Sequence, residues 1–405
     1  MIPVPEKRIA DFENMGFGMF IHYGLYSQLG QGEWIMNSAR ISREDYAKLA
    51  DTFTAADFDA RKIARTARAA GMKYITLTTR HHDGFSLYDT CGLSDYDAPH
   101  GCGRDLVREF VDACREAGLK PFFYHTLLDW HHPDFNTDFP RYLNYLRSSV
   151  ELLCTRYGEI GGIWFDGKWS RPQDDWEEDA LYGMIRRHQP DTILINNTGT
   201  DARGALGHPE LDSVTFECGR PQPINLSESP KYIASEMCQT LALHWGYAKN
   251  DLNFKSMGQI LEDLAVCRRY GSNLLLNVGP RGDGSLRLMD QAIFEGLGTW
   301  VRFNEEALRL PRPTDIPVEN RPKDFLLRSG NDYYLFIHSD SFLPQDAVEP
   351  GKEVFLLDRK VRAVTCLYNG AALPFTQEGN TVTVHAASFP YGPDLVIQAA
   401  KIETE

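Results

Sequence analysis

Short apolar runs alternate with longer amphipathic stretches over the first three quarters of the chain. The runs have the length and composition of buried strands and lie at 17–22, 74–79, 120–124, 162–165, 192–196, 213–216 and 273–278. Between them, apolar residues recur every three or four positions, which predicts helices at 59–70, 105–118, 141–157, 176–188, 256–269 and 286–308. Residues 242–245 are the best remaining place for an eighth strand.

Strands that alternate with helices in this way predict an α/β fold with a parallel sheet. The number of repeats favours a closed (β/α)8 barrel of the TIM type, regular or irregular. An open doubly wound sheet is the alternative. No Gly-x-Gly-x-x-Gly pattern follows the first strand, so a dinucleotide-binding domain has little support.

The pattern changes after Pro311-Arg312-Pro313, where the helical period ends. Short runs typical of strands follow at 325–328, 333–337, 354–357, 361–368, 381–384 and 395–398. Turn-forming residues such as Asn369-Gly370 separate them. We therefore predict a catalytic barrel over residues 1–312 and a small C-terminal antiparallel β-sandwich over residues 313–405.

Composition and charge are those of an ordinary globular protein. Of the 405 residues, 42% are hydrophobic and 24% charged, and the net charge of −14 argues against a nucleic-acid or anionic-membrane partner. No apolar run approaches the ~18 residues of a transmembrane helix, and the N-terminus lacks a signal-peptide pattern. The scattered cysteines form no Cys-x-x-Cys pair, so we expect reduced thiols and a cytoplasmic protein. A secreted protein trimmed of its signal peptide would look the same, and a homo-oligomer is compatible with the sequence.

Polar side chains stand at the ends of the predicted strands. In a (β/α) barrel the carboxyl ends of the strands meet at one rim, where the chemistry takes place. Core packing alone does not produce a polar group at the end of one strand after another, so we predict a single shared site. The groups are His22, His81-His82, Tyr124, Asp166, Asn196-Asn197 and Glu217.

Two chemistries suit histidines and carboxylates at such a rim. A metal hydrolase would hold an ion between imidazoles and an acid, but the neighbours His81 and His82 cannot easily both face one metal. Glycoside hydrolysis needs two carboxylates among neutral hydrogen-bonding groups, and Asp166 and Glu217 on separate strands fit this better. We predict neither a metal nor a cofactor. A non-catalytic carbohydrate-binding barrel is the alternative from another class.

Several motifs carry a resemblance to a known family. They are Phe-Gly-Met-Phe-Ile-His-Tyr-Gly at 17–24, Gly-Glu-Trp at 32–34, Arg-His-His-Asp-Gly-Phe at 80–85, Trp-Phe-Asp at 164–166, Glu-Met-Cys at 236–238, Trp-Gly-Tyr at 245–247 and Asn-Leu-Leu-Leu-Asn-Val-Gly-Pro-Arg-Gly-Asp-Gly at 273–284. With these motifs in this order, the chain resembles the α-L-fucosidases of glycoside hydrolase family 29 over nearly its whole length. The fold that the resemblance implies, a (β/α) barrel with a C-terminal β-sandwich, coincides with the one predicted from the pattern.

The resemblance also implies roles for the rim residues. Asp166 resembles the nucleophile of a retaining mechanism. The implied activity is that of a retaining exo-α-L-fucosidase acting on a fucosylated oligosaccharide or glycoconjugate, with a related retaining exo-glycosidase of different sugar specificity as the alternative. The positions that match substrate-binding residues are His22, Glu33, Trp34, His81, His82, Tyr124 and Trp245.

The motifs do not fix the general acid/base. Glu217 has the chain position of the acid/base in several members, and Glu33 has a rival claim in others. A retaining pair needs its carboxyls about 5–5.5 Å apart, which two barrel strands hold more rigidly than a long loop, so we favour Glu217. The arginine that many members carry after the fifth strand is absent from residues 196–199, and Arg203 or Arg220 would have to replace it.

Overall fold

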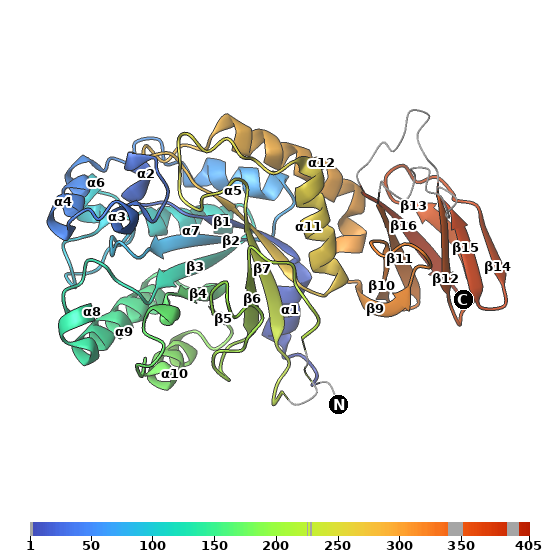
Figure 1. The fold of residues 1–405 in the computed structure, drawn as a ribbon, viewed down its shortest axis with the longest axis horizontal. Helices are drawn as coiled ribbons and strands as arrows, with labels where there is room; N and C mark the ends of the chain where they lie inside the picture. The colour runs from blue at the N-terminus through green and yellow to red at the C-terminus, as the bar shows by residue number, and fades with distance from the viewer. Residues whose placement is uncertain (1–2, 225, 227–228, 339–350, 387–396) are drawn as a thin grey trace. The chain divides into compact units, whose positions relative to one another are not determined.

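The computed structural model describes residues 3–224, 226, 229–338, 351–386 and 397–405, which form two compact units (Figure 1). The first unit comprises Met1–Lys255 and Asn273–Glu295, and the second comprises Ser256–Ser272 and Gly296–Glu405. The domain boundary that we predict at residue 312 stays a prediction.

Parallel strands close into a barrel in the first unit, in the order in which they follow along the chain. Strand β8 pairs with β1, from Phe17 opposite Leu274 to Ile21 opposite Val278, and this pairing closes the sheet. The predicted TIM-type barrel is therefore confirmed. The eight strands are β1 Phe17–Ile21, β2 Tyr74–Arg80, β3 Lys120–Thr126, β4 Gly162–Asp166, β5 Ile193–Asn196, β6 Ser213–Glu217, β7 Ala234–Thr240 and β8 Asn273–Val278.

The prediction of a strand at 242–245 is wrong, because the missing strand is β7. Its residues are mostly polar or small, so it does not read as an apolar run, yet all of them are buried. Glu236 lies inside the barrel, where its carboxylate accepts hydrogen bonds from the Tyr74 hydroxyl and, at 3.0 Å, from Trp164 Nε1. A glutamate can occupy the core here because two aromatic donors from other strands satisfy it.

Aromatic side chains fill the interior of the barrel. Phe20, Tyr74, Phe122 and Trp164 belong to one buried cluster, with Tyr74 and Phe122 ring centroids 5.0 Å apart and those of Phe20 and Trp164 5.3 Å apart. A barrel filled in this way has no pore, so a ligand can bind only at one of its ends.

Helices lie on the connections between the strands. Asp59, Asp105 and Asp138 precede three of them and accept a hydrogen bond from the backbone N–H three residues on, which caps the helix. The six predicted helices are confirmed to within a few residues, whereas α1 was not predicted. The α-helices are α1 Lys7–Met15, α2 Tyr26–Leu29, α3 Ile35–Ser38, α4 Arg43–Ala47, α5 Ala60–Ala69, α6 Ala98–Cys102, α7 Leu106–Glu116, α8 Asp134–Thr137, α9 Phe139–Arg156, α10 Glu178–His188, α11 Met257–Arg269 and α12 Leu288–Leu308.

The C-terminal strands of the second unit form two antiparallel sheets. One has the order β13-β16-β11-β10-β9 and the other β12-β15-β14. Leu335 and Ile402 of the first sheet share a buried cluster with Phe355 and Val382 of the second, so the predicted β-sandwich is confirmed. Strands β9 and β14 were not predicted, and residues 395–396 of one predicted strand lie outside the described residues. The strands are β9 Arg312–Pro317, β10 Phe325–Ser329, β11 Asp332–His338, β12 Lys352–Leu356, β13 Val361–Cys366, β14 Phe375–Glu378, β15 Thr381–His385 and β16 Ile397–Thr404.

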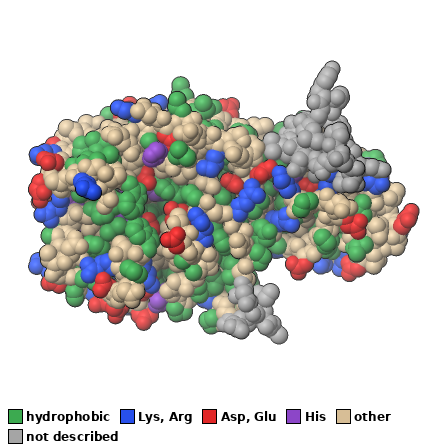
Figure 2. All heavy atoms as spheres, in the orientation of Figure 1, with side chains coloured by type: hydrophobic (Ala, Val, Ile, Leu, Met, Phe, Trp, Pro, Cys, Tyr) green, Lys and Arg blue, Asp and Glu red, His purple; other side chains and the backbone are tan. Residues whose placement is uncertain are grey.

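Charged side chains of both signs are mixed at the surface. On the face drawn in Figure 2, Lys and Arg side chains lie among Asp and Glu side chains. The chain has 56 acidic and 42 basic residues, so its excess negative charge is interspersed with cations on this face. In the part of the chain that the structure describes, no helix is long and apolar enough to cross a membrane.

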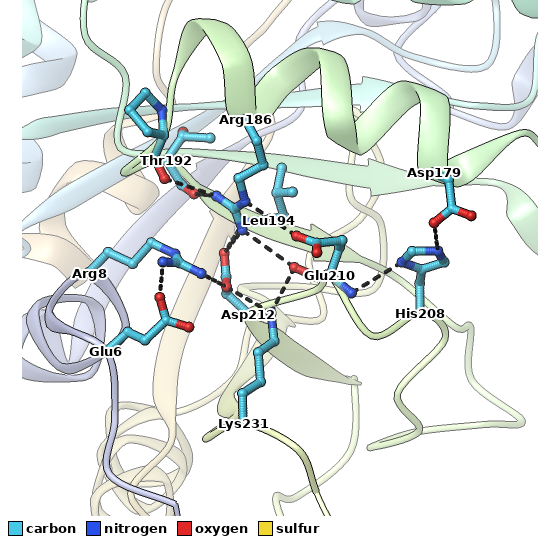
Figure 3. A network of polar contacts seen from close by, with 11 residues as sticks. Glu6, Arg8, Asp179, Arg186, Thr192, Leu194, His208, Glu210, Asp212 and Lys231 are labelled. Carbon is cyan, nitrogen blue, oxygen red and sulfur yellow. Dashed lines mark hydrogen bonds and ion pairs between the residues drawn. The ribbon is translucent and has the colours of Figure 1, made fainter.

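Few backbone contacts join strands β5 and β6, and side chains supplement them. Only Ile195 and Ser213 pair in register between them. Just before β6, the buried carboxylate of Asp212 accepts the backbone N–H of Leu194 in β5 at 3.0 Å (Figure 3). Because this bond joins the two strands away from their carboxyl ends, it stabilises the barrel at the end opposite the rim.

Cations from distant parts of the chain surround the same carboxylate (Figure 3). Arg8, Arg186 and Lys231 donate to Asp212 at 2.9, 2.6 and 3.2 Å. Burial alone would raise the pKa of Asp212, but Arg8, Arg186 and Lys231 together hold it below its ordinary value. This carboxylate therefore stabilises the fold at neutral pH, and its contribution is lost as the pH falls through the lowered pKa.

An Asp212→Asn variant should lower the free energy of unfolding at neutral pH by about 3 kcal/mol, because three cations lose their shared counter-charge. The difference from the wild type should shrink when the pH is lowered, as the wild-type carboxyl takes up its proton. Urea unfolding at several pH values measures both effects. Asp179→Asn is the control, because Asp179 pairs with His208 at the edge of the same network with its side chain 96% exposed. Equal midpoints for the two variants would contradict the account.

Candidate active site

One pocket of about 440 Å³ lies at the carboxyl ends of the barrel strands. All nine residues that the sequence assigns to the site line it, from strand ends and from the loops that follow them. The lining residues are Phe20, His22, Glu33, Trp34, His81, His82, Tyr124, Trp164, Asp166, Trp169, Asn197, Thr198, Gly199, Thr200, Asp201, Glu217, Cys238 and Trp245.

Asp166, the last residue of β4, has hydrogen-bonding partners on both carboxylate oxygens. Oδ2 accepts from the Tyr124 hydroxyl at 3.0 Å and lies 3.4 Å from His82 Nε2. Oδ1 accepts from Trp169 Nε1 at 3.2 Å and from Asn197 Nδ2 at 3.3 Å. Four groups from four segments of the chain thus fix the orientation of this carboxylate.

These partners also favour the charged form of Asp166. Burial alone would raise its pKa, but the hydrogen bond and charge of His82, with the donors Trp169 and Tyr124, hold it below the ordinary value. His82 Nδ1 lies 2.7 Å from the Thr126 hydroxyl, which donates its own proton to the carbonyl of Leu128. Nδ1 therefore donates to Thr126, and Nε2 is the ring nitrogen that faces Asp166.

Glu217, the last residue of β6, shares a hydrogen-bond donor with Asp166. Asn197 Nδ2 lies 2.7 Å from Glu217 Oε2 and 3.3 Å from Asp166 Oδ1, so these two oxygens are at most about 6 Å apart. The Asn197 carbonyl accepts from the Thr215 hydroxyl at 2.8 Å, which fixes the orientation of the amide. The two carboxyls are thus held across one amide group.

The environment of Glu217 favours its neutral form. Burial and the negative charge of Asp166 raise the pKa of Glu217, and the hydrogen bond from Asn197 offsets only part of the effect. The neighbouring carboxyls therefore have pKa values displaced in opposite directions. At a pH between them, Asp166 is ionised and Glu217 carries a proton.

Glu33 occupies a different part of the wall. It is 6% exposed, and its Oε2 accepts the backbone N–H of Gly246 at 2.8 Å, in the loop after β7. That loop is held in turn by Asp251, which accepts the backbone N–H groups of Leu243 and His244. Burial raises the pKa of Glu33, and the Gly246 N–H lowers it in part. Glu33 is thus a rigidly held group attached to the wall formed by the β7 loop.

The pocket histidines His22 and His81 are neutral hydrogen-bonding groups. Burial lowers the pKa of His22 to about 3. Its Nδ1 lies 2.6 Å from the side-chain Oδ1 of Asn277, so Nδ1 carries the hydrogen and leaves Nε2 as an acceptor. Burial and the neighbouring His82 lower the pKa of His81, whose ring stacks on Tyr124 with centroids 5.5 Å apart. The Nδ1 of His81 is buried and has no hydrogen-bond partner among the described residues.

Sequence reasoning missed several lining residues. Asn197 was noted only as a strand end, and its place after β5 was the signal that could have assigned it. Trp169 and the loop of residues 198–201 gave no such signal, because they follow the strands at distances that the pattern does not define. Neither Arg203 nor Arg220 is among the described lining residues, and Arg203 Nε instead donates to the backbone carbonyl of Glu217.

The described residues do not assemble a metal site. Among them, no group of three or more His, Cys, Asp or Glu side chains is arranged so that it could hold a metal ion. His82 illustrates the reason, because its two nitrogens face Thr126 and Asp166.

The chain is similar to known proteins over most of its length. Residues 5–306 match the family model described as Alpha-L-fucosidase. Tissue alpha-L-fucosidase of Rattus norvegicus is 29% identical over 372 residues, which cover 83% of this chain and 77% of the rat protein. The structure of alpha-L-fucosidase isoenzyme 1 from Paenibacillus thiaminolyticus matches with a TM-score of 0.84 and 30% identity over 98% of this chain and 99% of that one. The Thermotoga maritima alpha-fucosidase in complex with fucose matches with a TM-score of 0.77 and 25% identity, covering 99% and 97% of the two chains.

A Gly167→Ala variant should disturb the carboxylate beside it. Gly167 has φ +98°, and a Cβ there would lie 2.8 Å from the backbone nitrogen of Leu128. We expect a loss of more than about 2 kcal/mol in unfolding free energy, from backbone strain together with the clash. Gly92→Ala is the control, because Gly92 has φ +84° with no atom near its Cβ, and should cost about 1 kcal/mol. Urea unfolding compares the two, and an equal loss would show that the approach of Leu128 does not matter.

Proposed function

Since the chain belongs to the alpha-L-fucosidase family, we propose that it is a retaining exo-α-L-fucosidase. It would remove terminal α-linked L-fucose from a fucosylated oligosaccharide or glycoconjugate through a covalent glycosyl-enzyme intermediate. The observation that carries the proposal is the pair Asp166 and Glu217, bridged by Asn197 and displaced in pKa in opposite directions.

The separation of the two carboxyls supports retention of configuration. Retaining glycosidases hold them about 5–5.5 Å apart, whereas inverting enzymes leave about 6.5–9.5 Å for a water molecule. The bridge through Asn197 limits the nearest oxygens of Asp166 and Glu217 to about 6 Å. A water cannot enter between sugar and base at that spacing, so direct attack by Asp166 is favoured.

The direction of each pKa shift favours the protonation state that its step requires. In the first step, the ionised Asp166 attacks the anomeric carbon while Glu217 gives its proton to the departing oxygen of the aglycone. In the second step, the carboxylate of Glu217 takes a proton from water, which attacks the same carbon and releases Asp166. Glu217 is then protonated again and Asp166 is ionised, ready for the next substrate.

The closed floor of the pocket supports removal of terminal residues. Phe20, Tyr124 and Trp164 line the pocket and also belong to the buried core of the barrel, so the cavity has no exit behind them. A sugar there can carry a substituent only on the side that faces solvent. His22 and His81 supply neutral hydrogen-bonding groups for its hydroxyls, as the neutral forms favoured by burial.

An Asp166→Ala variant should lose at least about a thousandfold in kcat/KM on an aryl α-L-fucoside, because the covalent step has no nucleophile. Circular dichroism should show an unchanged fold. Sodium azide should restore turnover by taking the place of Asp166, and the product should be a fucosyl azide of inverted configuration. Substantial hydrolysis by this variant without azide would rule out Asp166 as the nucleophile.

Azide should distinguish the two candidates for the acid/base. With Glu217→Ala and an activated aryl fucoside, the intermediate still forms, and azide should attack it to give a fucosyl azide of retained configuration. Glu33→Ala is the matched control and should give no azide product. The reverse outcome, with azide product from Glu33→Ala alone, would assign the acid/base to Glu33.

The pH dependence of kcat/KM should be bell-shaped. Activity falls on the acidic side as Asp166 takes up a proton, at a pH below its ordinary pKa of 3.8. It falls on the alkaline side as Glu217 loses its proton, at a pH above its ordinary pKa of 4.5. Glu217→Gln should abolish the alkaline limb for an activated aryl fucoside, whose leaving group needs no proton. An alkaline limb that survives in this variant would belong to another group.

A further inference from the structure

Exposure divides the lining of the pocket into a floor and a mouth. Four lining residues are exposed, and we call them the mouth: Trp34, Trp169, Thr200 and Asp201. The other lining residues are buried or half-buried. If the proposed function holds, on which this inference rests, the sugar occupies the floor and its aglycone must point through the mouth.

The two indoles of the mouth are held in place. Their ring centroids lie 5.9 Å apart with an angle of 20° between the planes, and each residue is 38% exposed. Trp169 is fixed by its hydrogen bond to Asp166, and Trp34 packs edge-on against Trp130 with centroids 5.1 Å apart. Aromatic rings fixed beside a sugar pocket offer a surface for the apolar face of a second sugar or of an aryl group.

Apart from the histidines, the charged side chains that line the pocket are all acidic. Among the described lining residues there is no Lys or Arg. Of the acidic ones, Asp201 is the group that lies in the mouth itself, where an aglycone would pass it. The acidic lining residues are Glu33, Asp166, Asp201 and Glu217.

The cations nearest to the mouth along the chain are engaged elsewhere. Arg203 follows Asp201 by two positions, but its Nε donates to the backbone carbonyl of Glu217. Lys168 precedes Trp169 and forms an ion pair with Glu178. Neither cation lines the pocket. The charge of Arg203 acts on Glu217, whose pKa it lowers in part, and Asp201 is the charged side chain of the mouth itself.

We propose that the mouth is an aglycone subsite that accepts neutral groups with an apolar face and disfavours aglycones that carry a carboxylate or a sulfate. Trp34 and Trp169 supply the apolar contact, and Asp201 supplies the repulsion. The substrate class would then be fucosides of neutral glycans, rather than fucosides in which the neighbouring sugar is anionic. Two like charges about 10 Å apart near a protein surface change a rate several-fold at low salt, an effect that salt removes.

Two coumarin substrates that differ by one charge test the proposal. They are 4-methylumbelliferyl α-L-fucoside and its 4-carboxymethyl analogue, whose leaving groups have similar reactivity. We expect kcat/KM for the neutral substrate to be at least about fivefold higher at about 10 mM salt, with the ratio approaching one at about 1 M salt. Equal values at low salt, or a preference for the anion, would overturn the inference while leaving the proposed function intact. Failure to hydrolyse either substrate would instead contradict the proposed function.

Asp201 variants identify the source of the repulsion. Asp201→Asn should reduce the neutral-to-anionic ratio of kcat/KM several-fold at low salt, and Asp201→Lys should bring it below one. Asp112→Asn, an exposed change on α7, is the charge-matched control and should leave the ratio unchanged. Because the ratio is measured on active enzyme, partial misfolding does not affect it. An unchanged ratio in both Asp201 variants would contradict the assignment to this residue.

A Trp34→Ala variant tests the apolar contact. The KM for 4-methylumbelliferyl α-L-fucoside should rise about tenfold, whereas inhibition by free L-fucose, which has no aglycone, should weaken by less than about threefold. Equal losses for substrate and fucose would assign Trp34 to the sugar itself and remove it from the aglycone subsite.

Discussion

The site depends on a single amide group between two carboxyls. Asn197 donates to Asp166 and to Glu217 and is itself oriented by Thr215. Two ionised carboxylates at this distance would repel each other, and the protein avoids this because the surroundings favour opposite protonation states. The donors around Asp166 stabilise its charge, while burial and that same charge raise the pKa of Glu217. The short distance between Asp166 and Glu217 is therefore also a cause of their opposite pKa shifts.

The barrel supports this arrangement at its weakest seam. Strands β5 and β6 share one residue pair in register. Asn197 and Glu217 lie at the carboxyl ends of these two strands. Side chains reinforce the seam at both ends, with Asp212 and its cations at one end and Asn197 with Thr215 at the other. Stability and chemistry are therefore separated in space along the same two strands, as is usual in this type of barrel.

The strand pattern predicted the groups at the strand ends, whereas loop residues were assigned only where a family motif marked them, as at Glu33, Trp34 and Trp245. Asp166 and Glu217 could be assigned because the last residue of a barrel strand reaches the rim whatever loop follows it. Strand β7 was not predicted because Glu236 lies on its interior face. Only the folded structure brings the two aromatic donors to this glutamate. Trp169 and Asp201 were not predicted because loop residues reach the pocket through tertiary contacts, which leave no periodic pattern in the sequence.

The central claim is that Asp166 forms a covalent bond to the sugar while its neighbour handles the proton. The most direct measurement is to treat the protein with a 2-deoxy-2-fluoro-fucosyl fluoride, which slows release of the intermediate, and to locate the label by peptide mass spectrometry. The account predicts one 2-fluorofucosyl group per chain, on the peptide that contains Asp166. A label on the peptide containing Glu217 or Glu33 would contradict it.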